Sequence, residues 1–210
     1  VLMSCILGDK KPSSGQVLID GKAGKAKNKI AVLLQENTIP NSLKVEELIA
    51  FFQSISDNPL TNQEVQKLLQ FKEDQYQQFA DKLSGGQRRL LAFVLCLIDK
   101  PKILFLDEPT AGMDTSTRQR FWEIVNDLKK AGTTILYSSH YIEEVEHTAV
   151  RILVLHQGKL IRDTTPYAMR HEEKEKQVTL PSSFVSIVHG LPDIYEITGK
   201  RDVISFMTKD

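Results

Sequence analysis

The sequence predicts an α/β fold built around a mostly parallel sheet. Short apolar runs bounded by turn residues alternate with segments of helical periodicity, which is the pattern of strands that alternate with helices. The chain has 210 residues, of which 41% are hydrophobic. This is enough for one sizeable domain with a packed core and a small appendage. The composition therefore excludes an intrinsically disordered chain.

Charge, cysteine content and hydropathy exclude several classes of protein. The formal net charge is zero, whereas proteins that bind nucleic acid through its phosphates carry a basic excess, so we expect no nucleic-acid partner. Cys5 and Cys96 have apolar neighbours, which indicates buried thiols in a reducing compartment. The longest apolar run, residues 90–98, is too short for a bilayer, which needs about 20 residues. We expect a cytoplasmic protein that meets a membrane only through partner subunits.

The first part of the chain predicts two strands. Residues 1–7 are an apolar segment that starts without a helix cap. Residues 16–20 read as a strand that turns at Gly21. Residues 30–34 read as a buried strand that ends at Gln35.

Two short helices are predicted next. Ser42 is expected to cap the first helix, which carries an apolar stripe with i, i+3, i+4, i+7 spacing. The stripe consists of Val45, Leu48, Ile49 and Phe52. Thr61 and Glu64 form a capping box for the second helix.

Residues 83–87, Leu-Ser-Gly-Gly-Gln, form the strongest single motif. Ser84 can cap the following helix, with Gln87 at the third position of a capping box. Gly85 and Gly86 have no side chains, so a phosphate can approach the free N–H groups and the positive end of the helix. The plainer interpretation is an ordinary glycine-rich helix start. The helix that follows is apolar nearly all round, so we expect it to be buried.

Residues 103–106 predict a short buried strand that delivers Asp107 and Glu108 to its carboxyl end. Ligands bind at that edge of open α/β sheets. An aspartate there can hold Mg²⁺, and the adjacent glutamate can accept a proton from an attacking water. The plainer interpretation is a polar turn, since Asp-Glu-Pro is favourable turn chemistry.

The remaining elements follow from periodicity and turn signals. A helix is predicted from about Thr115 to Ala131, followed by a strand at 133–137 and a hairpin at 151–163. The charged run 172–176 predicts a solvated linker or a helix end. Residues 177–180 and 193–208 can form strands of a small appendage.

Taken together, these motifs resemble the ATP-binding cassette (ABC) ATPases, with five family motifs in the family's order. They are Gln35 (Q-loop), residues 83–87 (signature), Asp107 with Glu108 (Walker B aspartate and catalytic glutamate), residues 111–114 (D-loop) and His140 (switch histidine). The family more often has Ser-Ala-Leu-Asp where this sequence has Ala-Gly-Met-Asp. The resemblance covers roughly residues 1–163 and implies the P-loop NTPase fold of the ABC type.

The resemblance also implies the site residues and the ligands, ATP and Mg²⁺. The catalytic set is Glu108, His140 and Gln35. The nucleotide-binding set is Ser84, Gly85, Gly86, Gln87 and Asp114. The magnesium set is Asp107 and Gln35. The expected domains are a cassette at 1–163, with a helical subdomain at about 41–100, and an appendage at 164–210.

The family's phosphate-binding loop, GxxxxGK[ST], does not occur in the sequence. Aligned on the family pattern, residues 1–7 would continue the helix that follows this loop. We therefore expect an N-terminally truncated chain that binds ATP poorly by itself, because the loop supplies N–H groups and a lysine to the phosphates. The alternative is a natural protein without the loop.

The implied function is to power transport, as an export-type cassette on the inner face of the cell membrane. The implied partners are a transmembrane permease subunit and a second cassette, alike or different. Two alternatives stay open. One is a non-catalytic regulatory subunit. The other is a soluble ABC ATPase that acts on DNA or ribosomes, although the stretch between Gln35 and Leu83 is too short for a long coiled coil and only one set of motifs is present.

Two further residue types have plainer interpretations. Arg88 and Arg89 are expected to form a solvated or partner-facing patch, because adjacent arginines are mostly exposed. Trp122, the only tryptophan, is expected to pack in the core.

Overall fold

The computed structural model describes residues 2–19, 21–23, 30–36, 39–40, 42–171, 176–191, 194–200 and 202–208. Contacts divide the chain into two compact units, Val1–His140 (unit 1) and Tyr141–Asp210 (unit 2). The domain boundary expected after residue 163 stays a prediction.

Unit 1 is built on a parallel sheet of three strands in the order β3, β4, β5. The strands are β3 (Ile30–Leu33), β4 (Ile103–Asp107) and β5 (Thr134–Ser138). Leu33 is paired with Leu106, and Asp107 with Ser138, so the three carboxyl ends lie at one edge. This confirms the predicted parallel α/β core.

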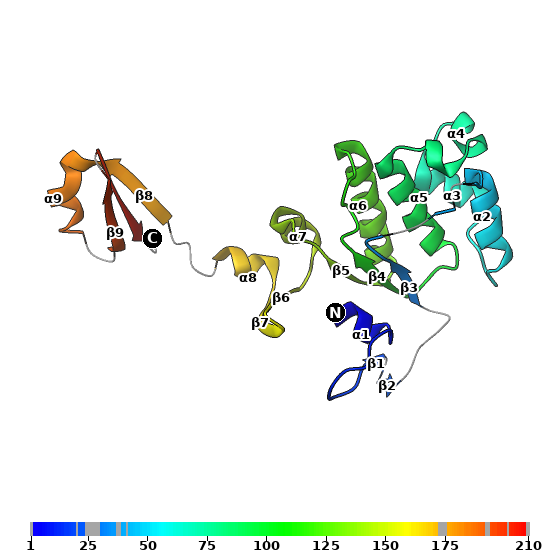
Figure 1. The fold of residues 1–210 in the computed structure, drawn as a ribbon, viewed down its shortest axis with the longest axis horizontal. Helices are drawn as coiled ribbons and strands as arrows, with labels where there is room; N and C mark the ends of the chain where they lie inside the picture. Colours follow the sequence, from blue (N-terminus) through cyan, green and yellow to red (C-terminus); the bar gives the residue numbers. More distant parts are fainter. Residues whose placement is uncertain are drawn as a thin grey trace. The chain divides into compact units, whose positions relative to one another are not determined.

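Helices cover both faces of this sheet (Figure 1). α5 (Gly85–Leu97) and α6 (Thr115–Lys130) lie on one face, and α1 (Leu2–Ile6) lies on the other. The alternation of side chains along β3 fits this arrangement. Leu33 belongs to the core beside α5, whereas Val32 and Leu34 face an open pocket of about 890 Å³ that α1 also lines. The predicted early strand is seen as the small hairpin β1 (Leu18–Ile19) and β2 (Lys22–Ala23), while Asp20 lies outside the described residues.

The helical part of unit 1 contains α2 (Val45–Ser54), α3 (Asn62–Leu69), α4 (Glu73–Gln77) and a short 3₁₀ turn, η1 (Ala80–Lys82). The prediction that Ser42 caps α2 is wrong. Lys44 is the cap residue, because its backbone N–H donates to the carboxylate of Glu47 at 2.8 Å and it forms a β-bridge with Phe79. These contacts start the helix after Lys44.

The capping box that begins α3 is confirmed. Glu64 N–H donates to Thr61 Oγ1 at 3.2 Å, and the carboxylate of Glu64 accepts from Thr61 N–H at 2.7 Å. The hydrogen bond from the Thr61 backbone, ahead of that from its side chain, lowers the pKa of Glu64. The two residues therefore satisfy orphan donors of the first turn.

The core of unit 1 is centred on α5, whose buried residues lie on all sides, as predicted. Phe93 of α5 packs against Phe121 of α6 with ring centroids 4.4 Å apart, and Phe121 contacts Trp122. The predicted packing role of Trp122 is confirmed, since its indole also meets Tyr137 of β5 edge-on. Burial raises the pKa of the Cys96 thiol to about 11.

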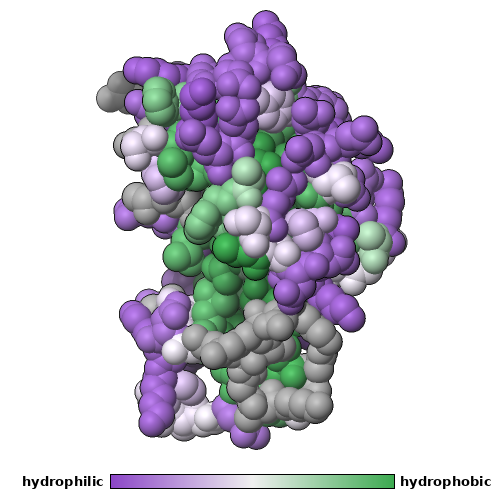
Figure 2. Space-filling model, turned by 90° about the vertical axis from the view of Figure 1, so that its right-hand side faces the viewer, coloured by the Kyte–Doolittle hydropathy of each residue, from purple (hydrophilic) through white to green (hydrophobic). Residues whose placement is uncertain are grey.

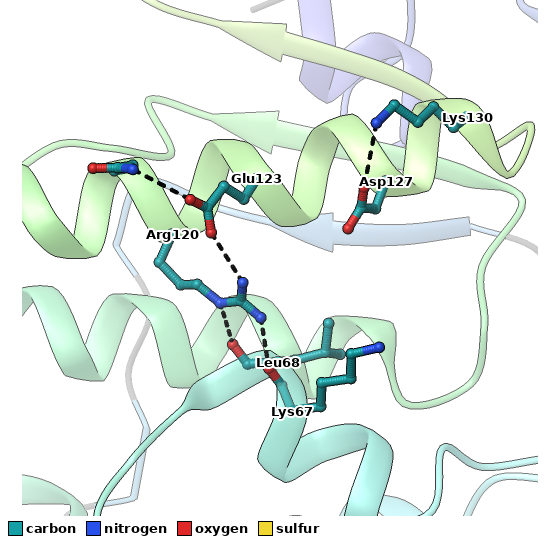
Figure 3. A network of polar contacts seen from close by, with 7 residues as sticks. Lys67, Leu68, Arg120, Glu123, Asp127 and Lys130 are labelled. Atoms are coloured by element: carbon teal, nitrogen blue, oxygen red, sulfur yellow. Dashed lines mark hydrogen bonds and ion pairs between the residues drawn. The ribbon is translucent and has the colours of Figure 1, made fainter.

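An arginine joins α6 to the end of α3 by hydrogen bonds to backbone carbonyls (Figure 3). Arg120 Nε donates to Leu68 O at 3.0 Å, and one terminal nitrogen of Arg120 donates to Lys67 O. Arg120 also pairs with Glu123 at 3.0 Å. The last carbonyls of α3 lack helical partners of their own, and Arg120 supplies donors to them.

Apolar surface gathers in the middle of the face of unit 1 on which α2 lies, with mostly polar surface above it (Figure 2). The exposed large apolar side chains of unit 1 include Leu34, Phe51 and Ile55. Among the described residues, no helix combines the length and apolar character that a bilayer crossing demands.

Unit 2 holds a helix and hairpin followed by a small α/β element. α7 (Ile142–Thr148) precedes β6 (Ile152–His156) and β7 (Lys159–Thr164), which pair antiparallel around Gln157 and Gly158 as predicted. α8 (Pro166–His171) follows, and residues 172–175 of the charged run lie outside the described residues.

The expected C-terminal strands are present in unit 2. β8 (Lys176–Pro181), β9 (Ile194–Lys200) and β10 (Val203–Thr208) form an antiparallel sheet in the order β8, β10, β9. The turn η2 (Ser182–Phe184) and α9 (Val185–Val188) connect β8 to β9. Val188, Ile204 and Phe206 form a separate small core. Asp193 lies outside the described residues.

Phe121→Ala is expected to lower the free energy of unfolding of unit 1 by about 3–5 kcal/mol, because it removes a fully buried ring that contacts two others. The matched control is Phe51→Ala, which removes a half-exposed ring and should cost about 1 kcal/mol. Urea unfolding followed by the fluorescence of Trp122 measures both. Equal losses in the two variants would contradict the placement of the core.

Candidate functional site

The carboxyl edge of the sheet brings together residues that are far apart in the sequence. Gln35 follows β3 by two residues, Asp107 ends β4 with Glu108 directly after it, and His140 follows β5 by two residues. Because the strands are parallel, these polar groups lie at one edge, where open α/β sheets bind ligands.

A serine that the sequence analysis missed organises the two carboxylates. Ser138 O–H donates to Asp107 Oδ1 at 2.5 Å, and Ser138 Oγ accepts from Glu108 N–H at 3.0 Å. Ser138 is the register partner of Asp107 on the neighbouring strand. A parallel pairing of the strands that end in Asp-Glu and Ser-Ser-His would have indicated this contact.

Glu108 and His140 form a direct pair. Glu108 Oε2 lies 2.7 Å from His140 Nδ1, and the carboxylate is mostly buried whereas the imidazole is largely exposed. Glu108 has φ 45°, the left-handed region that non-glycine residues seldom occupy and that often marks functional sites. The strained turn after β4 gives Glu108 a direction different from that of Asp107, so the two carboxylates have different partners.

The prediction that Arg89 lies in an exposed patch is wrong. Arg89 is only 8% exposed, and its guanidinium donates to five backbone carbonyls at 2.5–3.3 Å. The acceptors are the carbonyl oxygens of Leu34, Gln35, Asp107, Glu108 and Pro109. These carbonyls lie at or just beyond the ends of β3 and β4, and they provide a polar lining that lets an arginine be buried. Burial lowers the pKa of Arg89 from its ordinary value.

The signature segment forms the predicted capping box at the start of α5. Gln87 N–H donates to Ser84 Oγ at 3.2 Å, and Ser84 N–H donates to Gln87 Oε1 at 3.1 Å. Ser84 and Gly85 are exposed at the N-terminus of a 13-residue helix. This end of the helix carries free N–H groups and a positive dipole, which favour an anion.

Gly86 lies against Asp114, the residue that caps the N-terminus of α6. A Cβ atom at Gly86 would be 3.1 Å from Asp114 Oδ2 and 3.4 Å from Met113 Cα. The carboxylate is held in place because it accepts from Ser116 O–H, Thr117 N–H and Thr117 O–H. These bonds, that from Ser116 first, hold the pKa of Asp114 well below its usual range.

A small pocket links the Q-loop, the signature helix and the segment before Asp114. It has a volume of about 280 Å³, and Gln35, Gly85, Arg88 and Gly112 are among the residues that line it. Gly112 has φ 74°, which explains glycine at this position. The structure therefore places Gln35 near the start of the signature helix as well as near the sheet edge.

The oxygen donors at the sheet edge have the chemistry that Mg²⁺ prefers. Asp107 has one oxygen bonded to Ser138, which leaves the other for a metal, and the Gln35 amide adds a neutral oxygen. Within the part of the chain that the structure describes, no three His, Cys, Asp or Glu side chains are grouped to hold a metal ion. The assignment of a magnesium ion to Asp107 and Gln35 stays a prediction.

A family comparison decides the class of protein. The model of the family described as ABC transporter matches residues 1–111, more than half of the chain. The chain belongs to the ABC transporter family. The resemblance stated from the Q-loop, signature and Walker B residues is therefore confirmed, as is the expected fold.

Curated relatives of this ABC chain are ATP-binding proteins. The probable multidrug ABC transporter ATP-binding protein YbhF of Escherichia coli (strain K12) is 30% identical over 190 residues, which are 85% of this chain and 33% of YbhF. Linearmycin resistance ATP-binding protein LnrL of Bacillus subtilis (strain 168) is 32% identical over 76% of this chain and 54% of LnrL. Nod factor export ATP-binding protein I of Cupriavidus metallidurans is 32% identical over 80% of this chain and 58% of that protein. The chain thus spans 33–58% of these relatives.

Solved structures share the fold of the ABC chain. A structure titled as the ATP binding subunit of an ABC transporter superposes with a TM-score of 0.69 at 22% identity, over 81% of this chain and 75% of that one. A dimeric ATP-binding cassette in a post-hydrolysis state bound to ADP and phosphate gives 0.66 at 21% identity, over 79% of each chain.

In the ABC signature, Gly86→Ala is expected to lower the free energy of unfolding by about 1–3 kcal/mol, because the new methyl group meets the fixed Asp114 carboxylate. Gly85→Ala is the matched control. It lies one residue earlier in the same helix with no neighbour within 4 Å, so it should change stability by less than about 1 kcal/mol. Urea unfolding measures both. If the two variants were equally stable, Gly86 would not pack on the D-loop as the structure shows.

Proposed function

We propose that this chain is the ATP-hydrolysing part of an ABC transporter of the export type. The observation that carries the proposal is the Glu108–His140 pair at 2.7 Å, beside Asp107 at the carboxyl edge of the parallel sheet. The names of the relatives support export, since they include a multidrug transporter protein and a Nod factor export protein.

The proposed reaction is the attack of water on the terminal phosphorus of ATP. A phosphorus–oxygen bond forms from the water, the bond to the bridging oxygen of ADP breaks, and the water proton passes to the carboxylate of Glu108. His140 is hydrogen-bonded to that carboxylate and orients it, and the family resemblance assigns its imidazole to the terminal phosphate. Asp107 and Gln35 would hold a magnesium ion, which would offset the charge of the phosphates.

A second cassette completes each ATP site in this proposal. Ser84, Gly85 and Asp114 are exposed at the starts of α5 and α6, where they can meet a phosphate held by the partner cassette. The chain would thus serve two sites, with Glu108 acting on its own nucleotide and its signature acting on the partner's.

The membrane partner is proposed to be a separate transmembrane permease, with the cassette bound on the inner face of the membrane. The exposed apolar side chains of α2 and of the residue after it, Phe51 and Ile55, give the helical part a surface that a partner can cover.

A second candidate function is a non-catalytic regulatory subunit. This is the alternative that the sequence motifs leave open. Such a subunit would offer Ser84 to Gln87 to a partner's nucleotide and would have no need of Glu108.

Glu108→Gln is expected to lower ATP turnover by the complete transporter that contains this chain by about 100-fold or more, because the amide cannot accept the water proton. Glu73→Gln, the same change on an exposed turn of α4, serves as the control and should leave turnover unchanged. Release of phosphate is the measurement. Turnover within a few-fold of the parent would refute the general-base role and favour the regulatory alternative.

The 210 residues alone are expected to bind ATP too weakly to detect at micromolar concentrations, because no loop in the sequence supplies the N–H groups and lysine for its phosphates. Isothermal titration of the isolated chain with Mg-ATP measures this, with far-ultraviolet circular dichroism to show that the chain is folded. Micromolar affinity would show that Asp107, Gln35 and neighbouring residues suffice for binding.

A further inference from the structure

Arg89 has a hydrogen-bonding pattern that packing alone does not require. A guanidinium has five N–H donors in a fixed planar fork. In Arg89 all five are used: Nε donates to Pro109 O, and the two terminal nitrogens donate to the other four carbonyls. Each acceptor is a different residue, so the fork fits two backbone segments at once.

The two segments are those that carry the proposed chemistry. One holds Gln35, and the other holds Asp107 and Glu108. Arg89 bonds only the backbone carbonyls of these residues, so their side chains can make other contacts. The guanidinium therefore bridges the Q-loop and the Walker B turn just beyond the last paired residues of β3 and β4.

Arg89 also restrains the strained turn at Glu108. A left-handed glutamate persists only where its surroundings fix it. The contacts that fix it come from both sides: Ser138 accepts from its N–H group, and Arg89 donates to the carbonyls of residues 107–109.

The signature segment lies one turn away on the same helix. Gln87 precedes Arg89 by two residues, and Gly86 packs on Asp114. Because α5 is buried along its length from Arg89 to Leu97, its first turns move as a rigid body with the guanidinium.

We propose that Arg89 is a positioning residue that ties the signature helix to Gln35 and Glu108, so that movement of the signature on a partner's nucleotide shifts the carboxylate of the chain's own site. The inference rests on the proposed function, because it assigns Glu108 to hydrolysis. It predicts that the two ATP sites of a cassette dimer are linked through this side chain.

Arginine is the residue that this role needs. Lysine has three donors on a single nitrogen, so it can serve at most three of the five carbonyls. Methionine fills a similar volume but donates to none of the five carbonyls, of which Glu108 O keeps the Ala111 N–H as a donor. Arg89→Lys keeps the charge, and Arg89→Met removes both charge and donors.

The structure offers a matched control in Arg120. Its guanidinium also donates to two backbone carbonyls, those of Lys67 and Leu68, but it lies at the end of α3 and away from the sheet edge (Figure 3). Arg120→Met removes the same kind of contact from a place that has no role in the proposal.

The first measurement needs no nucleotide. Amide hydrogen exchange is compared in the folded chain for peptides that cover 108–113, where Ala111 N–H donates to Glu108 O and Met113 N–H to Thr110 O. Arg89→Met should speed exchange there by about tenfold or more, with Arg89→Lys in between. Arg120→Met should speed exchange near 66–72 and leave 108–113 unchanged.

The second measurement is ATP turnover by the complete transporter. Arg89→Met and Arg89→Lys should lower kcat by about tenfold or more with little change in KM, because the carboxylate is misplaced while the phosphate contacts remain. Arg120→Met should leave kcat and KM within about threefold of the parent's values when the proteins are compared at equal concentrations of folded protein.

The outcomes separate the two proposals. Equal exchange at 108–113 in the Arg89 and Arg120 variants would overturn the positioning role, as would an Arg89→Lys variant with the parent's exchange and kcat. If Glu108→Gln leaves turnover intact, the proposed function fails, and the exchange measurement still decides whether Arg89 holds the turn.

Discussion

A buried guanidinium between two strand ends determines how the candidate site is built. Parallel strands bring their carboxyl ends to one edge, where backbone carbonyls need donors from outside the sheet. Arg89 supplies five donors to the carbonyls of residues 34, 35 and 107–109, which lie at or just beyond the ends of β3 and β4. The bonds let a charged residue be buried.

The same edge shows how two adjacent carboxylates acquire different roles. Asp107 ends β4 in the regular strand conformation, and one of its oxygens is bonded to Ser138. Glu108 leaves the strand with φ 45°, and its carboxylate reaches His140 beyond β5. A hydroxyl between the two residues bonds to both and fixes the turn. The strained backbone thus gives different directions to two adjacent carboxylates, which we propose as a metal ligand and a proton acceptor.

Local rules predicted much of this architecture, and contacts between distant segments account for what they missed. The capping boxes at Thr61 and Ser84 and the strand that ends in Asp107 depend on neighbouring residues, so the sequence indicated them correctly. The acceptors of Arg89 come from two other segments, and no spacing within the signature indicates that they converge. Ser42 failed as a cap because the bridge between Lys44 and Phe79, also distant in sequence, decides where α2 begins.

Two contacts therefore constrain the first turns of α5. One is made with Asp114 at the D-loop, and the other with the backbone at the sheet edge. Gly86 must be small because the Asp114 carboxylate is held 3.1 Å from where a Cβ would lie. Arg89 must be long and forked because its acceptors lie on two backbone segments, at the ends of β3 and β4. The buried remainder of α5 prevents either contact from relaxing by a shift of the helix. A phosphate that pulls on the N-terminus of this helix would then act on the D-loop and on the Walker B turn together. That shared rigidity is a physical reason for a glycine and an arginine to occur three residues apart at the start of α5.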